Sequence, residues 1–147
     1  MFRLSKGAEY AIRGVLHLTL QPRGKVTFID EIAAAQGVPK AYLAKIFQFL
    51  SKKGFLKSTR GAGGGFMLAR DPGEITLLDV IEAMEGPIHL NDCLIHKDFC
   101  ERVDTCPVHD VWREAQEKFL ESLSSCTFEK LARSPKLKRE KKVTKKR

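Results

Sequence analysis

Residues 42–70, "YLAKIFQFLSKKGFLKSTRGAGGGFMLAR", decide the fold because they contain a helix, a turn and a hairpin in unbroken succession. The helical part repeats apolar residues on one face and stops at Gly54. These apolar residues are Leu43, Ile46, Phe47 and Leu50. Two β-prone runs, "FLKS" and "FMLA", then flank "TRGAGGG", which is typical of a β-hairpin with a glycine-rich tip.

Two further helices are predicted before this stretch. Apolar residues recur at helical spacing over residues 5–21. The run "FIDEIAAAQ" comes next, where Thr27 with Asp30 predicts a capping box and Gly37 ends the helix. Two helices joined by a tight turn indicate a helix-turn-helix. With the hairpin added, we expect a winged helix: a mainly α fold with a small β-hairpin wing.

The second half of the chain predicts three more helices. Thr76 with Asp79 makes a capping box for a short helix that Gly86 closes. Pro107 begins a long helix that runs to about residue 124, and "TFEKLA" forms a last short one. The long helix carries one apolar stripe, made of Val108, Val111, Trp112, Ala115, Phe119 and Leu123. We expect this stripe to pack against a second copy of the chain, and packing on its own domain is the alternative.

Charge divides the chain into three parts. Residues 1–70 hold 12 Lys and Arg against 3 Asp and Glu, a net charge of +9, whereas residues 71–132 hold 5 against 14, a net charge of −9. The tail, residues 133–147, holds 9 basic residues and one acidic residue. The basic first part suits a polyanion, and the tail either adds attraction to phosphates or only keeps the protein soluble.

The sequence predicts a cytoplasmic protein. It shows no signal peptide, and no apolar run has the eighteen or so residues that a membrane span needs. Because the cytoplasm is reducing, the four cysteines indicate metal ligation or redox sensing in preference to disulfides.

Candidate DNA contacts lie on the helix of residues 39–53 and on the hairpin tip. The glycines do not make a nucleotide site, since Phe66 replaces the third glycine of the dinucleotide fingerprint and no Lys-Ser/Thr pair follows. Phosphates and base edges can be reached from the exposed helix face, and an arginine beside glycines suits a minor groove. The candidates are Lys40, Ala41, Tyr42, Lys45, Gln48, Arg60 and Gly61. The alternatives are solvated lysines and an ordinary flexible loop.

Three cysteines are gathered in "CLIHKDFCERVDTCPVH", residues 93–109. An iron-sulfur cluster ligated by three thiolates needs one ligand of another kind. A structural zinc site is the first alternative, although zinc sites more often contain a close Cys-x2-4-Cys pair than gaps of six and five residues. A metal-free thiol switch and an electron-transfer site are weaker alternatives. Cys126 lies apart from this group and is interpreted as a small core residue.

The segments "LSKGAEYAIR" and "YLAKIFQFLSKKGFLKSTRGAGGGFMLAR", followed by C-x6-C-x5-C-x2-H and a Trp-containing helix, resemble the IscR and NsrR branch of bacterial winged-helix regulators. The resemblance covers the chain up to about Ala132. It implies a homodimeric DNA-binding protein that carries an iron-sulfur cluster, [2Fe-2S] or [4Fe-4S]. IscR-type proteins tend to have an acidic residue where Ala44 stands, so the operator sequence does not carry over.

The resemblance also implies a ligand set. Cys93, Cys100 and Cys106 would hold the cluster. His109 has the placement of the IscR-type fourth ligand, and Glu9 matches the position from which NsrR-like proteins supply an acidic ligand across the dimer. His109 is preferred because it is close in sequence to Cys106, and the positive end of a helix favours the neutral imidazole that binds metal.

The sequence therefore predicts a transcription regulator, not an enzyme, whose operator binding responds to a cluster that senses nitric oxide, redox state or iron-sulfur supply. A zinc-stabilised winged-helix protein without a sensing role is the alternative. The expected organisation is a winged helix-turn-helix DNA-binding domain at 1–86, a cluster-binding loop at 87–107, a dimerisation helix with a short C-terminal helix at 107–132, and a disordered basic tail at 133–147. No membrane partner is expected.

Overall fold

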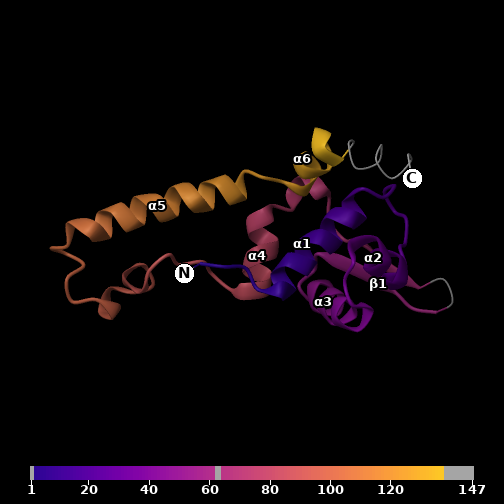
Figure 1. The fold of residues 1–147 in the computed structure, drawn as a ribbon, viewed down its shortest axis with the longest axis horizontal. Coiled ribbons are helices and arrows are strands. Elements are labelled where there is room, and N and C mark those ends of the chain that lie inside the picture. The colour runs from indigo at the N-terminus through magenta and orange to yellow at the C-terminus, as the bar shows by residue number, and fades with distance from the viewer. Residues whose placement is uncertain (1, 62–63, 138–147) are drawn as a thin grey trace.

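The structure, a computed structural model, describes residues 2–61 and 64–137. It confirms a mainly α fold with a small two-stranded hairpin (Figure 1). The first half contains α1 (Lys6–Thr19), α2 (Ile29–Gln36), α3 (Lys40–Lys52), β1 (Leu56–Thr59) and β2 (Gly65–Leu68). The second half contains the short turns η1 (Pro72–Glu74), η2 (Asp92–Leu94) and η3 (Lys97–Phe99), and the helices α4 (Leu77–Glu85), α5 (Pro107–Ser124) and α6 (Phe128–Ala132).

The start of α2 differs from the capping box predicted at Thr27. Phe28 is the N-cap residue and supplies no side-chain hydrogen bond, so that prediction is wrong. Thr27 instead pairs with Phe66 of β2, and each residue donates its backbone N–H to the other's carbonyl over 2.9 Å. Gly65 permits this pairing, because a Cβ there would overlap the Thr27 carbonyl. The backbone pairing of Thr27 with β2 therefore takes the place of the predicted N-cap hydrogen bond at α2.

The core lies where α1 crosses α3, and it extends to α4 and α6 (Figure 1). Its largest fully buried side chains include Phe47 of α3 and Phe128 of α6. Gly14 of α1 lies directly against the Phe47 ring, and a Cβ at this position would overlap two ring atoms. The two helices can therefore approach this closely only with glycine at position 14.

Gly14→Ala is expected to lower the free energy of unfolding. Alanine favours a helix over glycine by up to about 1 kcal/mol, but overpacking a core costs about 1–3 kcal/mol, so a net loss of about 1–2 kcal/mol is expected. Denaturant unfolding of Gly14→Ala and of the double variant Gly14→Ala/Phe47→Leu measures it. The smaller leucine side chain at position 47 should recover part of the loss, whereas a Gly14→Ala variant as stable as the parent would contradict the contact.

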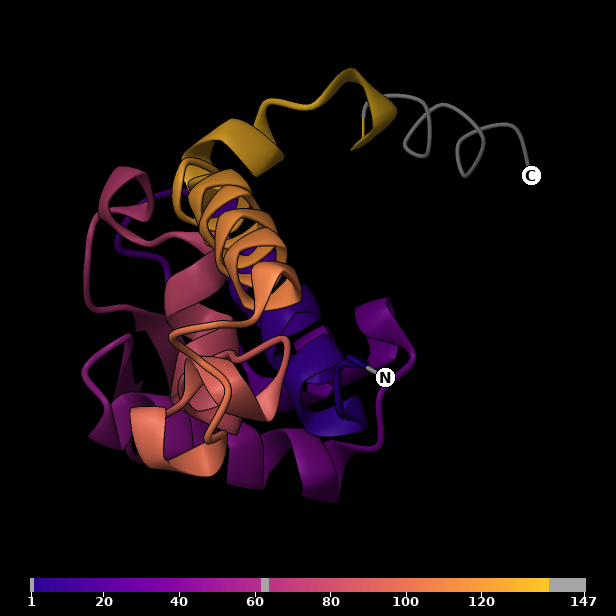
Figure 2. The ribbon, with the colours of Figure 1, turned by 90° about the vertical axis from the view of Figure 1, so that its left-hand side faces the viewer.

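The second half returns to the core through α6. The capping box at the start of α4 is confirmed, since Thr76 and Asp79 exchange both hydrogen bonds. The chain before α6 pairs with the chain before α4: Leu77 N–H donates to Cys126 O over 2.8 Å, and Phe128 N–H donates to Ile75 O over 2.9 Å. Between these anchored ends α5 extends along the molecule (Figure 1), and Figure 2 views it from the end that carries the cysteine loop.

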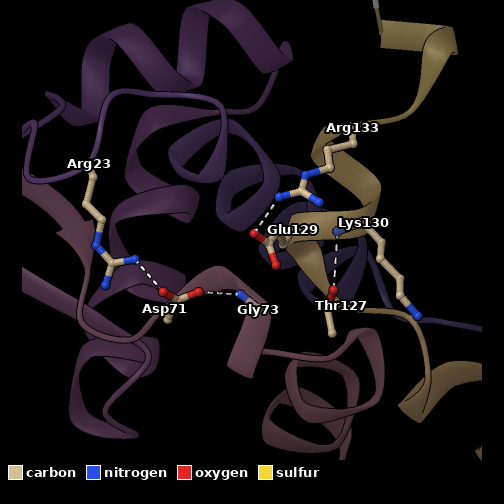
Figure 3. A network of polar contacts seen from close by, with 7 residues as sticks. All are labelled: Arg23, Asp71, Gly73, Thr127, Glu129, Lys130 and Arg133. Carbon is tan, nitrogen blue, oxygen red and sulfur yellow. Dashed lines mark hydrogen bonds and ion pairs between the residues drawn. The ribbon is translucent and has the colours of Figure 1, made fainter.

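Polar contacts surround the junction between η1 and α6 (Figure 3). Arg23 pairs with Asp71 at 2.7 Å, and Asp71 also accepts the Gly73 N–H at 2.8 Å. The Gly73 N–H, and then Arg23, lower the pKa of the Asp71 carboxyl. On α6, Arg133 pairs with Glu129 at 2.9 Å. Because these ion pairs are exposed, each contributes little, and the buried Phe128 is the main anchor of α6.

Candidate DNA interface and metal-binding loop

The exposed face of α3 carries the predicted DNA contacts. Lys40, Ala41, Tyr42, Lys45 and Gln48 are all exposed, whereas the opposite face of the helix is buried. Two of the five already have intramolecular contacts. Lys40 Nζ lies 2.8 Å from Asp30 Oδ1, and the Tyr42 ring packs edge-on against Tyr10 with ring centroids 5.6 Å apart. Lys45 and Gln48 have no such side-chain contact among the described residues.

A groove separates α3 from the hairpin, and it brings Gln48 together with the predicted wing residues. Its walls include Phe28, Gln48, Ser51, Lys52, Arg60 and Gly61. We call this feature the wing groove. Gln48 of α3 thus faces the same space as Arg60 and Gly61 of the hairpin, whereas the other four predicted contacts lie outside it. Sequence reasoning missed Phe28, since an aromatic residue next to an amphipathic helix usually joins the core.

The predicted metal-binding loop connects α4 to α5. Cys93 lies in η2, Cys100 follows η3, and Cys106 is the N-cap residue of α5. All three thiols are free and half-buried. Cys126, interpreted from the sequence as a small core residue, is also free and is half-buried. The loop therefore keeps three thiols partly accessible within one segment.

His109 lies between two hollows in this region. One hollow is lined by Cys93 and the other by Cys106, and His109 lines both, as do Lys97 and Arg113. The Nδ1 atom of His109 is buried and has no hydrogen-bond partner within the described ranges. A buried imidazole nitrogen without a partner is costly in an ordinary protein site and is available to a ligand.

The structure does not gather the candidate ligands into one group. Among residues 2–61 and 64–137, no three His, Cys, Asp or Glu side chains lie close enough together to hold a metal ion. Cys100 lines neither hollow. Glu9 lies in the first turn of α1, where an ion pair with Lys6 at 2.8 Å lowers the pKa of its carboxyl. Glu9 also lines neither hollow, and its residue-level assignment as a ligand remains a prediction.

A helix-turn-helix followed by a glycine-tipped hairpin, on a basic half of the chain, defines a winged-helix DNA-binding protein. The comparison with known families makes this specific. The chain belongs to the Rrf2 family, described as an iron-dependent transcriptional regulator, which matches residues 4–134. This confirms the resemblance to IscR-like regulators.

Individual relatives agree with this assignment. The HTH-type transcriptional regulator IscR of Xenorhabdus nematophila is 32% identical over 132 residues, which cover 90% of this chain and 80% of the relative. The structure of CymR (YrzC), the global cysteine regulator of B. subtilis, is 29% identical with a TM-score of 0.76 and covers 90% of this chain and 97% of that one. T. potens IscR is 26% identical with a TM-score of 0.70, covering 88% and 85%.

The protein is therefore a DNA-binding transcription regulator and not an enzyme. No helix in the described part of the chain is long and apolar enough to cross a membrane. The basic tail predicted at 133–147 lies mainly outside the described residues, and the family match ends at residue 134.

Proposed function

We propose that this regulator binds an iron-sulfur cluster and that the state of the cluster controls its binding to an operator. The observation that carries the proposal is the loop, which contains three free, half-buried thiols. Two of them, Cys93 and Cys106, line hollows that His109 also lines, and the Nδ1 atom of His109 is buried without a partner in the described structure. The family description as iron-dependent and the IscR relatives support it. We place the protein in the cytoplasm, where its DNA target is accessible and thiols stay reduced.

The donor set fits such a cluster. Cys93, Cys100 and Cys106 would supply thiolates, and His109, in the first turn of α5, would supply a nitrogen ligand. A bound cluster, [2Fe-2S] or [4Fe-4S], would supply iron and sulfide that react with oxidants or nitric oxide. The chain's own part is to bring these four side chains together. This requires the loop between α4 and α5 to rearrange, because its thiols are not gathered: Cys93 lies in η2, Cys100 follows η3 and Cys106 precedes α5.

His109 and Glu9 remain competing fourth ligands, and single substitutions separate them. His109→Ala is expected to shift the visible spectrum of the anaerobic protein and to shorten the cluster lifetime at least about tenfold, the range for a weakened metal site. Glu9→Ala should leave both unchanged, since Glu9 is already paired with Lys6 on the surface. The reverse pattern would assign the fourth ligand to Glu9, across a dimer.

We also propose that the regulator is a homodimer held by α5. Three apolar side chains in the first half of this helix are exposed, Val108 at 54%, Val111 at 64% and Trp112 at 40%. They lie at positions i, i+3 and i+4, on one face. The occupant that fits an amphipathic helix with this stripe is the same stripe of a second copy, which also matches a two-fold DNA site.

Anaerobic purification tests the proposed cofactor. The protein should be brown or red, with visible absorbance and with iron and acid-labile sulfide in comparable amounts. A colourless protein that contains zinc would instead support the alternative of a zinc-stabilised DNA-binding protein. Recording the spectrum again after exposure to oxygen and, separately, to nitric oxide identifies which of the two reacts with the cluster.

A further inference from the structure

Phe28 is a half-exposed aromatic side chain in a groove that charged and polar side chains also line. Its exposed fraction is 48%, and it faces the wing groove together with Gln48, Ser51 and Arg60. A single exposed apolar side chain is common on protein surfaces and needs no explanation by itself. Its position matters here, because the wing groove lies between the two elements that a winged helix places on DNA.

The geometry of a duplex determines what such a groove can contain. A recognition helix occupies the major groove, and an arginine at a wing tip suits the adjacent minor groove. One sugar-phosphate strand separates these two grooves of the DNA. With Gln48 of α3 on one side and Arg60 of the wing on the other, that strand must pass between them, along the wing groove.

We propose that the wing groove holds one DNA strand and that Phe28 packs against the carbon atoms of its deoxyribose. The inference deepens the DNA binding of this regulator and rests on the proposed placement of α3 and the wing. The groove matches both parts of a nucleotide. Lys52 and Arg60 suit the phosphate, and the phenyl ring suits the apolar face of the sugar.

Two features of the groove wall bear on this fit. Asp30 also lines the groove and would repel a phosphate, but its carboxylate is paired with Lys40 at 2.8 Å. Ile29 and Asp30 lie in the first turn of α2, whose backbone N–H groups lack partners inside the helix and receive no bond from the Phe28 side chain. These donors add to the phosphate-binding side of the groove. Because deoxyribose is the same at every base, the Phe28 contact should not discriminate between sequences.

The test compares Phe28→Ala with Phe49→Ala in the full chain. Phe49 is a matched control, since it is 39% exposed on α3, lies outside the wing groove and contacts Lys53. Affinity is measured for an operator duplex selected from a random pool and for an unselected duplex. Phe28→Ala should weaken the affinity for both duplexes by about five- to tenfold, which is the loss expected if about half of a phenyl side chain is buried on binding. Phe49→Ala should leave both affinities within about twofold of the parent.

A second variant guards against a folding effect. Phe28→Asn removes the ring but introduces a favourable N-cap residue for α2, so its melting temperature should match or exceed that of the parent while DNA binding still falls. Arg60→Ala serves as the positive control.

Unchanged binding in both Phe28 variants, with weakened binding in Arg60→Ala, would overturn the Phe28 contact alone. Loss of operator binding without loss of unselected binding would also overturn it, by showing a base contact. If neither the Phe28 variants nor Arg60→Ala changed DNA binding, both the Phe28 contact and the placement of the wing on DNA would be overturned.

Discussion

Each of the three substitutions Cys93→Ser, Cys100→Ser and Cys106→Ser is expected to yield a protein that lacks visible absorbance and binds at least about tenfold less iron. Serine keeps the size of cysteine but lacks a thiolate, which is the ligand an iron-sulfur cluster uses. All three thiols are free and half-buried, so the exchange should leave the fold intact. Anaerobic iron and sulfide analysis with a visible spectrum measures the effect.

Cys126→Ser is the matched control for these three variants. Cys126 is also a free, half-buried thiol, but it lies before α6, where its carbonyl accepts the N–H of Leu77. Its substitution should leave iron, sulfide and spectrum unchanged, because the backbone carbonyl remains. If Cys126→Ser lost the cluster as fully as the loop variants, or if a loop variant kept it, the assignment of the loop thiols would be wrong.

Val111→Lys is expected to dissociate the proposed dimer. Val111 is 64% exposed in one chain and lies in the first half of the stripe on α5, so a lysine there should not disturb the isolated fold. In a dimer it would place an unpaired charge in an apolar contact on both copies, at a cost of about 3 kcal/mol or more. That cost corresponds to a dimer weakened by at least about 100-fold. Sedimentation velocity over a range of concentrations measures it.

Glu117→Lys is the matched control on the same helix, since Glu117 is exposed and does not belong to the apolar stripe. This variant should keep the mass of the parent. The Val111→Lys monomer should also lose affinity for a two-fold operator more than for a half-site. A Val111→Lys protein with the parent's mass would place the subunit contact elsewhere or show that the chain is a monomer.

The helices of the DNA-binding half were predictable because local signals and tertiary packing agree there. The apolar repeats of α3, the stop at Gly54 and the glycine-rich tip each specify their element from neighbouring residues alone. Thr27 shows the limit of such signals. Its sequence context favours a cap, but the strand-like pairing with Phe66, which is distant in the sequence, takes its backbone groups instead.

The return of α6 to the core was not predictable for the same reason. Phe128 belongs to a five-residue helix, and the pairing of residues 126 and 128 with residues 77 and 75, which are distant in the sequence, holds its ring in the core. The loop shows a different limit. The spacing of Cys93, Cys100 and Cys106 suggests a ligand set, but spacing does not determine how an irregular loop folds. Among the described residues these thiols do not form one metal-binding group.

Control of operator binding by the cluster is tested most directly on one anaerobic preparation. Operator affinity is measured with the cluster intact and again after the cluster is removed by chelation. Both samples should keep the same helical content, and the DNA should be a selected operator with an unselected duplex for comparison. We predict that cluster removal changes operator affinity by at least about tenfold, within the usual range of coupling between two sites, and changes unselected binding far less. Equal operator affinity with and without the cluster would contradict control of DNA binding by the cluster.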